Sequence, residues 1–363
     1  MTARLSGRPA APGRLARLPS AGSVVRLAVA LGLTAFILWK SDPALVWRIA
    51  AGARPGPLLA AVLLVVVDRT LMAWRWLWLL VPFAPRSGET GRPPVGLWAV
   101  LHVFFVSSFV GTFLPASVGA DAVRATSLAR MGVPMADAVA SVFMDRVLGV
   151  LGVLGMGVAG LYLARDLPDL GPAVNASVLA ALAVTAAGCA AVAAAVFSAR
   201  VAAWLIALVQ RLPWARAHAA GSAVVGAVQR YASHHGLLGA VTLASLGVQV
   251  LRVLQAWCLG LGLGIAVPLP TYFAFIPIIL LVMLLPVTVN GLGTSQAAFV
   301  LFFAAAGVGR PEAFALSVLF VALGIVGNLP GGLLWTRSGL TPRPAPEAPG
   351  TPPVEAPTSR GPA

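Results

Sequence analysis

Long apolar runs recur along this chain and constrain its fold more than any other feature. Several of them approach the ~20 residues that a helix needs to cross the hydrocarbon core of a bilayer. Hydrophobic residues make up 59% of the 363 residues, whereas Asp, Glu, Lys and Arg make up only 10%. Because so few polar residues cannot cover the surface of a soluble protein of this length, the sequence predicts an all-α polytopic membrane protein.

Composition divides the chain into three regions. Residues 1–23 are rich in Pro, Arg and Ala and predict a disordered basic N-terminal tail. Residues 24–336 contain the apolar runs and predict a transmembrane domain. Residues 337–363 are rich in Pro and predict a disordered C-terminal tail, because they cannot form a packed core.

The formal net charge of +14 restricts the partners that the chain can have. We expect no nucleic-acid partner, since no soluble basic domain is predicted to bind one. In a membrane protein, positive charge instead gathers in cytoplasmic loops and contacts anionic lipids. We therefore expect a membrane protein whose partners are membrane lipids with anionic headgroups. Neither a cofactor nor a metal is expected, because no histidine has carboxylate or thiol neighbours at ligand spacing.

Two segments, 114–124 and 285–295, each place Leu-Pro and Gly residues inside apolar sequence. Pro115 and Pro286 each remove a backbone donor, and Gly119 permits a positive φ, so each segment is predicted to end one helix and begin another. At membrane depth, backbone broken in this way is tolerated only where it is buried in protein or lines a wet cavity. We therefore expect the functional site at these structural breaks.

The distribution of basic residues favours one topology. We expect two re-entrant helical hairpins, at 95–130 and 271–307, which would enter from opposite sides as an inverted repeat. Together with cytoplasmic termini, this layout places 16 of the 25 Lys and Arg residues in the cytoplasm and five outside, as the positive-inside rule expects. The alternative, eight full spans, nearly removes that bias. The six full spans are expected at 24–39, 55–82, 135–163, 173–197, 237–267 and 312–335.

Charged residues interrupt the predicted spans. Each costs about 2.5 to 3.5 kcal/mol at the centre of a span. We expect Asp68 and Asp145 to pair with arginines of other helices. Four arginines face these two carboxylates, so an excess of positive charge is left for a ligand. The four arginines are Arg69, Arg75, Arg146 and Arg252.

The starts of the two helices that follow the breaks should also attract anions. The first is expected to begin near 119–121, with Asp121 as its cap and Arg124 one turn further on. The second is expected to begin near 293–295 with a neutral cap. Unpaired backbone N–H groups and the helix dipole make each start a candidate anion site.

Four motifs then occur in an order that resembles one known family. They are Ala73-Trp-Arg75-Trp76, Phe113-Leu-Pro-Ala-Ser-Val-Gly-Ala-Asp121-Ala-Val-Arg124, Ser141-Val-Phe-Met-Asp145-Arg146 and Leu285-Pro followed by Asn290-Gly-Leu-Gly-Thr-Ser-Gln296. Over 24–336 the chain resembles the transmembrane region of lysylphosphatidylglycerol synthases. That resemblance implies a membrane domain that flips aminoacylated phosphatidylglycerol between leaflets. It also implies that aminoacyl transfer by this chain is not expected, because the separate soluble synthase domain does not follow Trp335. Other stand-alone members are associated with polyprenyl-phosphate sugar metabolism.

These observations predict a stand-alone, flippase-like lipid translocase that binds an anionic phospholipid or polyprenyl-phosphate headgroup between the two breaks. The phosphate would be held by Arg75, Arg124, Arg146 and Arg252. These arginines would be oriented by Asp121 and Asp145. Donors from the second break would come from Asn290, Gly291, Gly293 and Thr294.

Two alternatives belong to other classes. The chain could be an enzyme or an accessory in glycolipid or aminoacyl-lipid synthesis, working with a separate synthase or glycosyltransferase. Its only candidates for a nucleophile or base are Asp121, Asp145 and His102, and no pair of them has diagnostic spacing, so no catalytic residue is assigned. The second alternative is that the chain is a structural subunit of a membrane complex.

Overall fold

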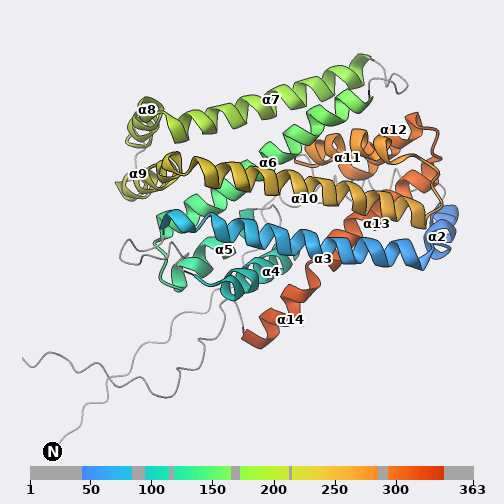
Figure 1. The fold of residues 1–363 in the computed structure, drawn as a ribbon, viewed down its shortest axis with the longest axis horizontal. Helices are drawn as coiled ribbons and strands as arrows, with labels where there is room; N and C mark the ends of the chain where they lie inside the picture. Colours follow the sequence, from blue (N-terminus) through green and yellow to red (C-terminus); the bar gives the residue numbers. More distant parts are fainter. Residues whose placement is uncertain are drawn as a thin grey trace, which may run out of the picture.

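The computed structural model describes residues 43–83, 95–113, 118–164, 172–211, 215–284 and 293–338, and every element in these ranges is a helix (Figure 1). The predicted N-terminal tail, the predicted span 24–39, the tips of the two Leu-Pro segments and residues 339–363 of the predicted C-terminal tail lie outside the described residues. The all-helical class predicted from the sequence is confirmed for the described part.

Four segments are long and apolar enough to cross a membrane. The helices α7 (Pro172–Phe197) and α8 (Ala199–Val209) pass the same test only when they are counted together, and they meet at a bend of 98°. The four single segments and α7 lie where the sequence predicted full spans. The chain is a multi-pass membrane protein. The four segments are α3 (Pro55–Trp78) with η1 (Val81–Phe83), α6 (Met135–Ala164), α10 (His235–Gly262), and α13 (Arg310–Val326) with α14 (Leu329–Ser338).

Each predicted hairpin consists of two short helices. The first pair is α4 (Leu97–Phe113) and α5 (Val118–Arg130), and the second is α11 (Leu269–Leu284) and α12 (Thr294–Ala305). The longest has 17 residues, and at ~1.5 Å per residue none of them crosses a ~30 Å hydrocarbon core at full thickness. The helix pairs are confirmed, whereas their re-entrant path and their inverted relation stay predictions.

The two pairs are offset along the molecule. In Figure 1, α3, α6, α7 and α10 run along the long axis, with α8 and α9 (Ala215–Gln229) at one end and α2 (Pro43–Ala51) at the other. The helix α5 lies toward the α8–α9 end, and α12 lies toward the α2 end. This arrangement supports entry of the two hairpins from opposite sides.

The bend before α8 produces an amphipathic helix. Val201 N–H donates to Ser198 Oγ at 3.4 Å, which caps the helix after the turn. Arg200, Trp204 and Leu208 follow at four-residue spacing and are all exposed, so they share one face. Such a stripe fits a helix that lies along the headgroup region of a bilayer.

A short 3-10 helix, η2 (Arg230–Ser233), connects this region to the spans. The Tyr231 hydroxyl donates to the Leu79 carbonyl at 2.6 Å, and the Tyr231 ring meets the Phe83 ring edge-on at 5.5 Å. Burial raises the pKa of Tyr231 well above its ordinary value, so the hydroxyl stays protonated and keeps this bond. Arg230 also pairs with Asp137 of α6.

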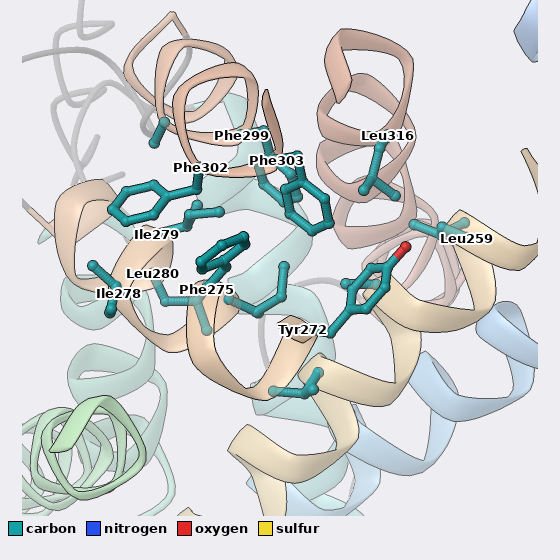
Figure 2. Close-up of a cluster of buried hydrophobic side chains, with 14 of the residues drawn as sticks. Leu259, Tyr272, Phe275, Ile278, Ile279, Leu280, Phe299, Phe302, Phe303 and Leu316 are labelled. Carbon is teal, nitrogen blue, oxygen red and sulfur yellow. The ribbon is translucent and has the colours of Figure 1, made fainter. Parts of the chain in front are cut away.

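Aromatic side chains fix the second hairpin in the core (Figure 2). The Phe303 ring of α12 lies 5.1 Å from Tyr272 and 5.7 Å from Phe275, both on α11, and 5.8 Å from Phe299. Figure 2 shows Leu259 of α10 and Leu316 of α13 beside this cluster. The cluster joins α11 and α12 to the long helices.

Glycines let two helix pairs approach closely. A Cβ on Gly160 of α6 would lie 2.8 Å from the Phe273 carbonyl oxygen of α11. A Cβ on Gly331 of α14 would collide with the Phe105 carbonyl of α4. Small residues permit such backbone contact in membrane proteins. The first helix of each hairpin is therefore in direct backbone contact with a span.

Candidate functional site

A polar cavity of about 370 Å³ lies between the two hairpins. Its wall includes Gly111 at the end of α4, Ala120 of α5, and Leu280 and Met283 of α11. Helices that lead into or out of both predicted breaks therefore contribute to the wall of one cavity. Its polar lining residues are Asp68, Arg69, Ser108, Thr112, Arg124, Arg146, Arg252, Gln255 and Asn328.

A second cavity, of about 400 Å³, lies between α6, α7 and α10. Side chains such as Leu148, Leu151 and Val192 line it, and Thr242 is the one lining residue with a hydroxyl among those described. No charged side chain of the described residues reaches it. The candidate headgroup site is therefore the first cavity.

Asp145 joins two arginines behind the wall of that cavity. Arg75 donates to Asp145 Oδ1 from Nε at 2.9 Å and from Nη2 at 2.6 Å, and Arg124 Nη1 donates to Oδ2 at 3.3 Å. Arg75 Nη1 also donates to Ser245 Oγ at 2.7 Å. The predicted pairing of Asp145 with arginines of other helices is confirmed. Arg75, however, is not among the cavity-lining residues, and its donors are used by Asp145 and Ser245, so the structure does not place it as a phosphate ligand.

Arg124 is held at the cavity wall by four groups. Its Nε donates to Ser107 Oγ at 3.2 Å, and its guanidinium carbon lies 4.4 Å from the Phe104 ring centre and 5.4 Å from that of Trp76. The fourth group is Asp145, whose carboxylate forms an ion pair with Arg124. Contacts between a guanidinium and aromatic rings stabilise the cation where water is scarce. Arg124 is thus a fixed positive charge facing the cavity.

Arg146 lines the same cavity and pairs with Asp121 of α5. Arg146 Nε lies 3.1 and 3.0 Å from the two Asp121 oxygens, and Nη2 donates to Oδ1 at 2.9 Å. The two side chains are 45% and 23% exposed, so this pair lies nearer the surface than the Asp145 network. The prediction that Asp121 caps α5 is wrong, because the helix already begins at Val118. Its carboxylate orients Arg146, in agreement with the second predicted role.

Asp68 lies between two more arginines of the cavity. Arg69 Nη1 is 3.6 Å from Asp68 Oδ2, and Arg252 Nε is 3.7 Å from Asp68 Oδ1. The predicted pairing of Asp68 with an arginine of another helix is confirmed by Arg252 of α10. Sequence reasoning treated Asp68 and Arg69 as intramembrane charges but not as site residues, although an Asp-Arg pair within an apolar span is itself a signal for a polar site.

Asn328 is the second site residue that sequence reasoning missed. It lies between α13 and α14, within the predicted final span 312–335, and its Nδ2 donates to Thr112 Oγ1 at 3.0 Å. Gly327, Asn328 and Pro330 could have revealed this break, since they repeat the combination of helix-breaking residues found in the two Leu-Pro segments.

The described part of the second break, from Gly293 onward, does not line the cavity. Gly293 precedes α12 with φ of 83°, and its N–H donates to Gln296 Oε1 at 2.6 Å, so this donor is already used. Neither Gly293 nor Thr294 is among the cavity-lining residues. Pro115, Pro286, Asn290 and Gly291 lie outside the described residues. Gly119 was predicted to be part of the first break, but it lies in the first turn of α5 and belongs to the helix.

The three candidates for a nucleophile or base do not converge. Asp121 and Asp145 are engaged by arginines, and His102 of α4 is buried and does not line the cavity. The arrangement resembles a binding site for an anion more than a site for covalent chemistry.

These features define a class: a multi-pass helical membrane protein with a positively charged cavity between two pairs of short helices. A family model described as "Lysylphosphatidylglycerol synthase TM region" matches residues 23–331. The chain belongs to this family, and the resemblance found in the sequence motifs is confirmed. The match covers the membrane region of such synthases, and no match to their catalytic domain was found. Comparisons with curated proteins and with solved structures gave no match.

Proposed function

We propose that the chain is a flippase-like lipid translocase that binds an anionic phospholipid or polyprenyl-phosphate headgroup in the cavity between the hairpins. The observation that supports this most directly is the charge of the lining. Four arginines and one aspartate line the cavity among the described residues, which gives a formal charge of +3. Such a cavity favours a negatively charged ligand.

The energetics of the bilayer support a lipid as that ligand. Arginine at membrane depth is costly unless it faces a polar cavity or a counter-charge. A phosphate headgroup supplies both the counter-charge and acceptor oxygens for guanidinium donors. Arg124 and Arg146 belong to the α5–α6 side of the cavity, and Arg252 belongs to α10. A headgroup could therefore pass from one group of arginines to the other while its acyl chains stay in the bilayer.

The proposed movement is a rocking of the hairpins about this cavity, as in transporters built from inverted repeats. The proposed setting is the bacterial cytoplasmic membrane, with both termini on the cytoplasmic side. The hairpins would then open the cavity alternately to the two leaflets.

Topology can be tested by cysteine labelling. Arg200 and Arg310 are both exposed and lie at the starts of α8 and α13. After Cys189 and Cys258 are replaced by alanine, single cysteines at these positions should react with an impermeant maleimide from opposite sides of intact cells or inverted vesicles. Reaction from the same side would contradict the hairpin topology.

Transport should depend on Arg252. Losing a charge-assisted hydrogen bond of roughly 1.5–3 kcal/mol should slow headgroup passage about tenfold or more. We expect the R252Q variant to show this loss when movement of fluorescent phosphatidylglycerol is followed in proteoliposomes. Arg310→Gln, outside the cavity, is the matched control and should retain the wild-type rate.

Two outcomes would overturn the proposal. Wild-type protein that moves anionic lipid no faster than protein-free vesicles would exclude a translocase. Conversion of a donor lipid to a new product by the purified chain would favour the enzyme or accessory alternative.

A further inference from the structure

The apolar cavity between α6, α7 and α10 is a groove with a buried floor and an exposed rim. Met144 and Leu148 of α6 are buried and form part of the floor. The rim on α7 consists of small residues that are exposed, namely Ala186, Ala190 and Ala193. Because an alanine side chain ends at Cβ, these residues leave the space between the two helices unfilled. The groove can therefore be entered from outside the molecule along α7.

The groove has the depth of one membrane leaflet. Its lining runs from Met144 to Leu154 on α6 and from Ala186 to Phe197 on α7. At ~1.5 Å per residue each stretch is roughly 15 Å long, which is half of the ~30 Å hydrocarbon core. Phe197 is the last residue of α7, and the amphipathic helix α8 follows it across the bend (Figure 1). The groove therefore begins at the level of α8, in the headgroup region, and ends near the middle of the membrane.

The lining of the groove excludes a polar occupant. The Thr242 hydroxyl donates to the Leu238 carbonyl at 2.8 Å, so the one hydroxyl among the described lining residues is already used. A water molecule in a cavity needs two to four polar partners, and cavities with apolar walls stay dry. An empty groove of about 400 Å³ would deprive its walls of dispersion contacts. The occupant that fits is a flexible hydrocarbon chain, which the surrounding bilayer supplies.

Cationic side chains lie at the headgroup end of the groove. The ring of His235, the first residue of α10, stacks on the ring of Phe197 at 5.5 Å. Arg200 follows Phe197 by three positions, in the first turn of α8, and is exposed. A guanidinium is a strong partner for phosphate. A molecule that combines a phosphate with a long hydrocarbon chain matches this arrangement, and phospholipids have that combination.

We propose that this groove holds one acyl chain of a phospholipid from the leaflet on the α8 side, with the phosphate of that lipid at Arg200. The inference does not depend on the proposed function, because this lipid is a resident partner and occupies a different cavity from the one proposed for transport. Since the walls of the groove are apolar, the site recognises the acyl chain and does not select among headgroups.

The resident lipid would support the ion pairs of the polar cavity. Met144 and Val147 of α6 line the groove, whereas Arg146, between them in sequence, lines the polar cavity. Asp145, the other residue between them, holds Arg124 at the wall of that cavity. An acyl chain packed against Met144 and Val147 would thus hold this segment of α6 from the opposite face.

Photocrosslinking from the two ends of an acyl chain tests the proposal. The full chain is placed in nanodiscs of phosphatidylcholine that contain a small fraction of phosphatidylcholine with a diazirine near either the carboxyl or the methyl end of one chain. Adducts are located by mass spectrometry of peptides. The carboxyl-end probe should label the region of Val196 and Phe197, and the methyl-end probe the region of Leu154 and Ala186. We expect labelling there to exceed that at exposed Leu63 of α3 by roughly fivefold, because a chain in the groove makes additional packing contacts.

A matched pair of variants tests whether the groove itself causes the enrichment. Ala190→Phe fills the groove and should reduce labelling of its walls to the level found at Leu63. Ala187→Phe is the control, because Ala187 is also an exposed alanine of α7 but is not among the described residues that line the groove. This control should keep the wild-type labelling pattern.

Three outcomes would overturn the proposal. In the wild-type protein, equal labelling of the groove and of Leu63, or the same pattern from both probes, would contradict a chain held in one orientation. If a short bismaleimide joined two copies of the Cys258→Ala variant through Cys189, which lines the groove, the occupant would be a second copy of the chain. The comparison of the two probes on wild-type protein needs no variant, so it stays decisive if Ala190→Phe fails to fold.

Discussion

Replacing Asp145 with asparagine is expected to destabilise the protein by about 3–5 kcal/mol, because it leaves buried positive charge without a partner. Asp145 is 2% exposed and pairs with Arg75, also 2% exposed, and with Arg124, which is 4% exposed. Asparagine preserves the shape of the side chain and removes its charge. Thermal unfolding of the purified protein in detergent measures the effect.

Asp121 provides the control for this experiment. Its ion pair with Arg146 is partly exposed to solvent. Exposed pairs contribute about 0–1 kcal/mol, so Asp121→Asn should lower stability far less. Asp145→Glu keeps the charge and should recover part of the loss. Equal destabilisation by the Asp121 and Asp145 variants would show that the network of Asp145 is not the buried structural element described above.

Truncation of Phe303 to alanine is also expected to have a large effect and should lower the free energy of unfolding by about 3–5 kcal/mol. Phe303 is fully buried and contacts three aromatic rings of α11 and α12 (Figure 2). Its loss should leave a cavity and loosen the second hairpin. We expect a lower unfolding temperature together with faster proteolysis between α11 and α12.

Leu301 supplies the matched control on the same helix. It is 48% exposed, so Leu301→Ala should change stability by only about 0.5 kcal/mol. If both alanine variants were equally stable, the aromatic cluster would not be what holds α12 in place.

Much of the fold follows from local signals in the sequence. Apolar runs and Pro or Gly residues predict where helices begin and end, since these residues change backbone bonding directly. The start of α12 at Thr294 agrees with the predicted start within 293–295. The pairing of Asp68 and of Asp145 with arginines also follows from the sequence, because isolated charges are too costly inside a membrane.

The assignment of individual arginines could not be made from the sequence. Whether an arginine faces a cavity or a carboxylate depends on the rotation and depth of its helix relative to helices far away in the chain. Arg75 lies about one and two-thirds helical turns beyond Arg69, and that difference places Arg75 beside Asp145 and Arg69 at the cavity. The role of Asn328 depends likewise on a contact with Thr112, 216 positions earlier in the chain.

The contact between Gly331 and Phe105 determines which parts of the molecule can move independently. Because the α14 backbone touches the α4 backbone there, α4 cannot shift without carrying α14 with it. The contact between Gly160 and Phe273 couples α11 to α6 in the same way. The mechanical units are then α4 with α14 and α11 with α6. The candidate cavity lies between these two units, because Gly111 and Thr112 of α4 and Leu280 and Met283 of α11 line its wall, so a displacement of one unit relative to the other would change the width of the cavity.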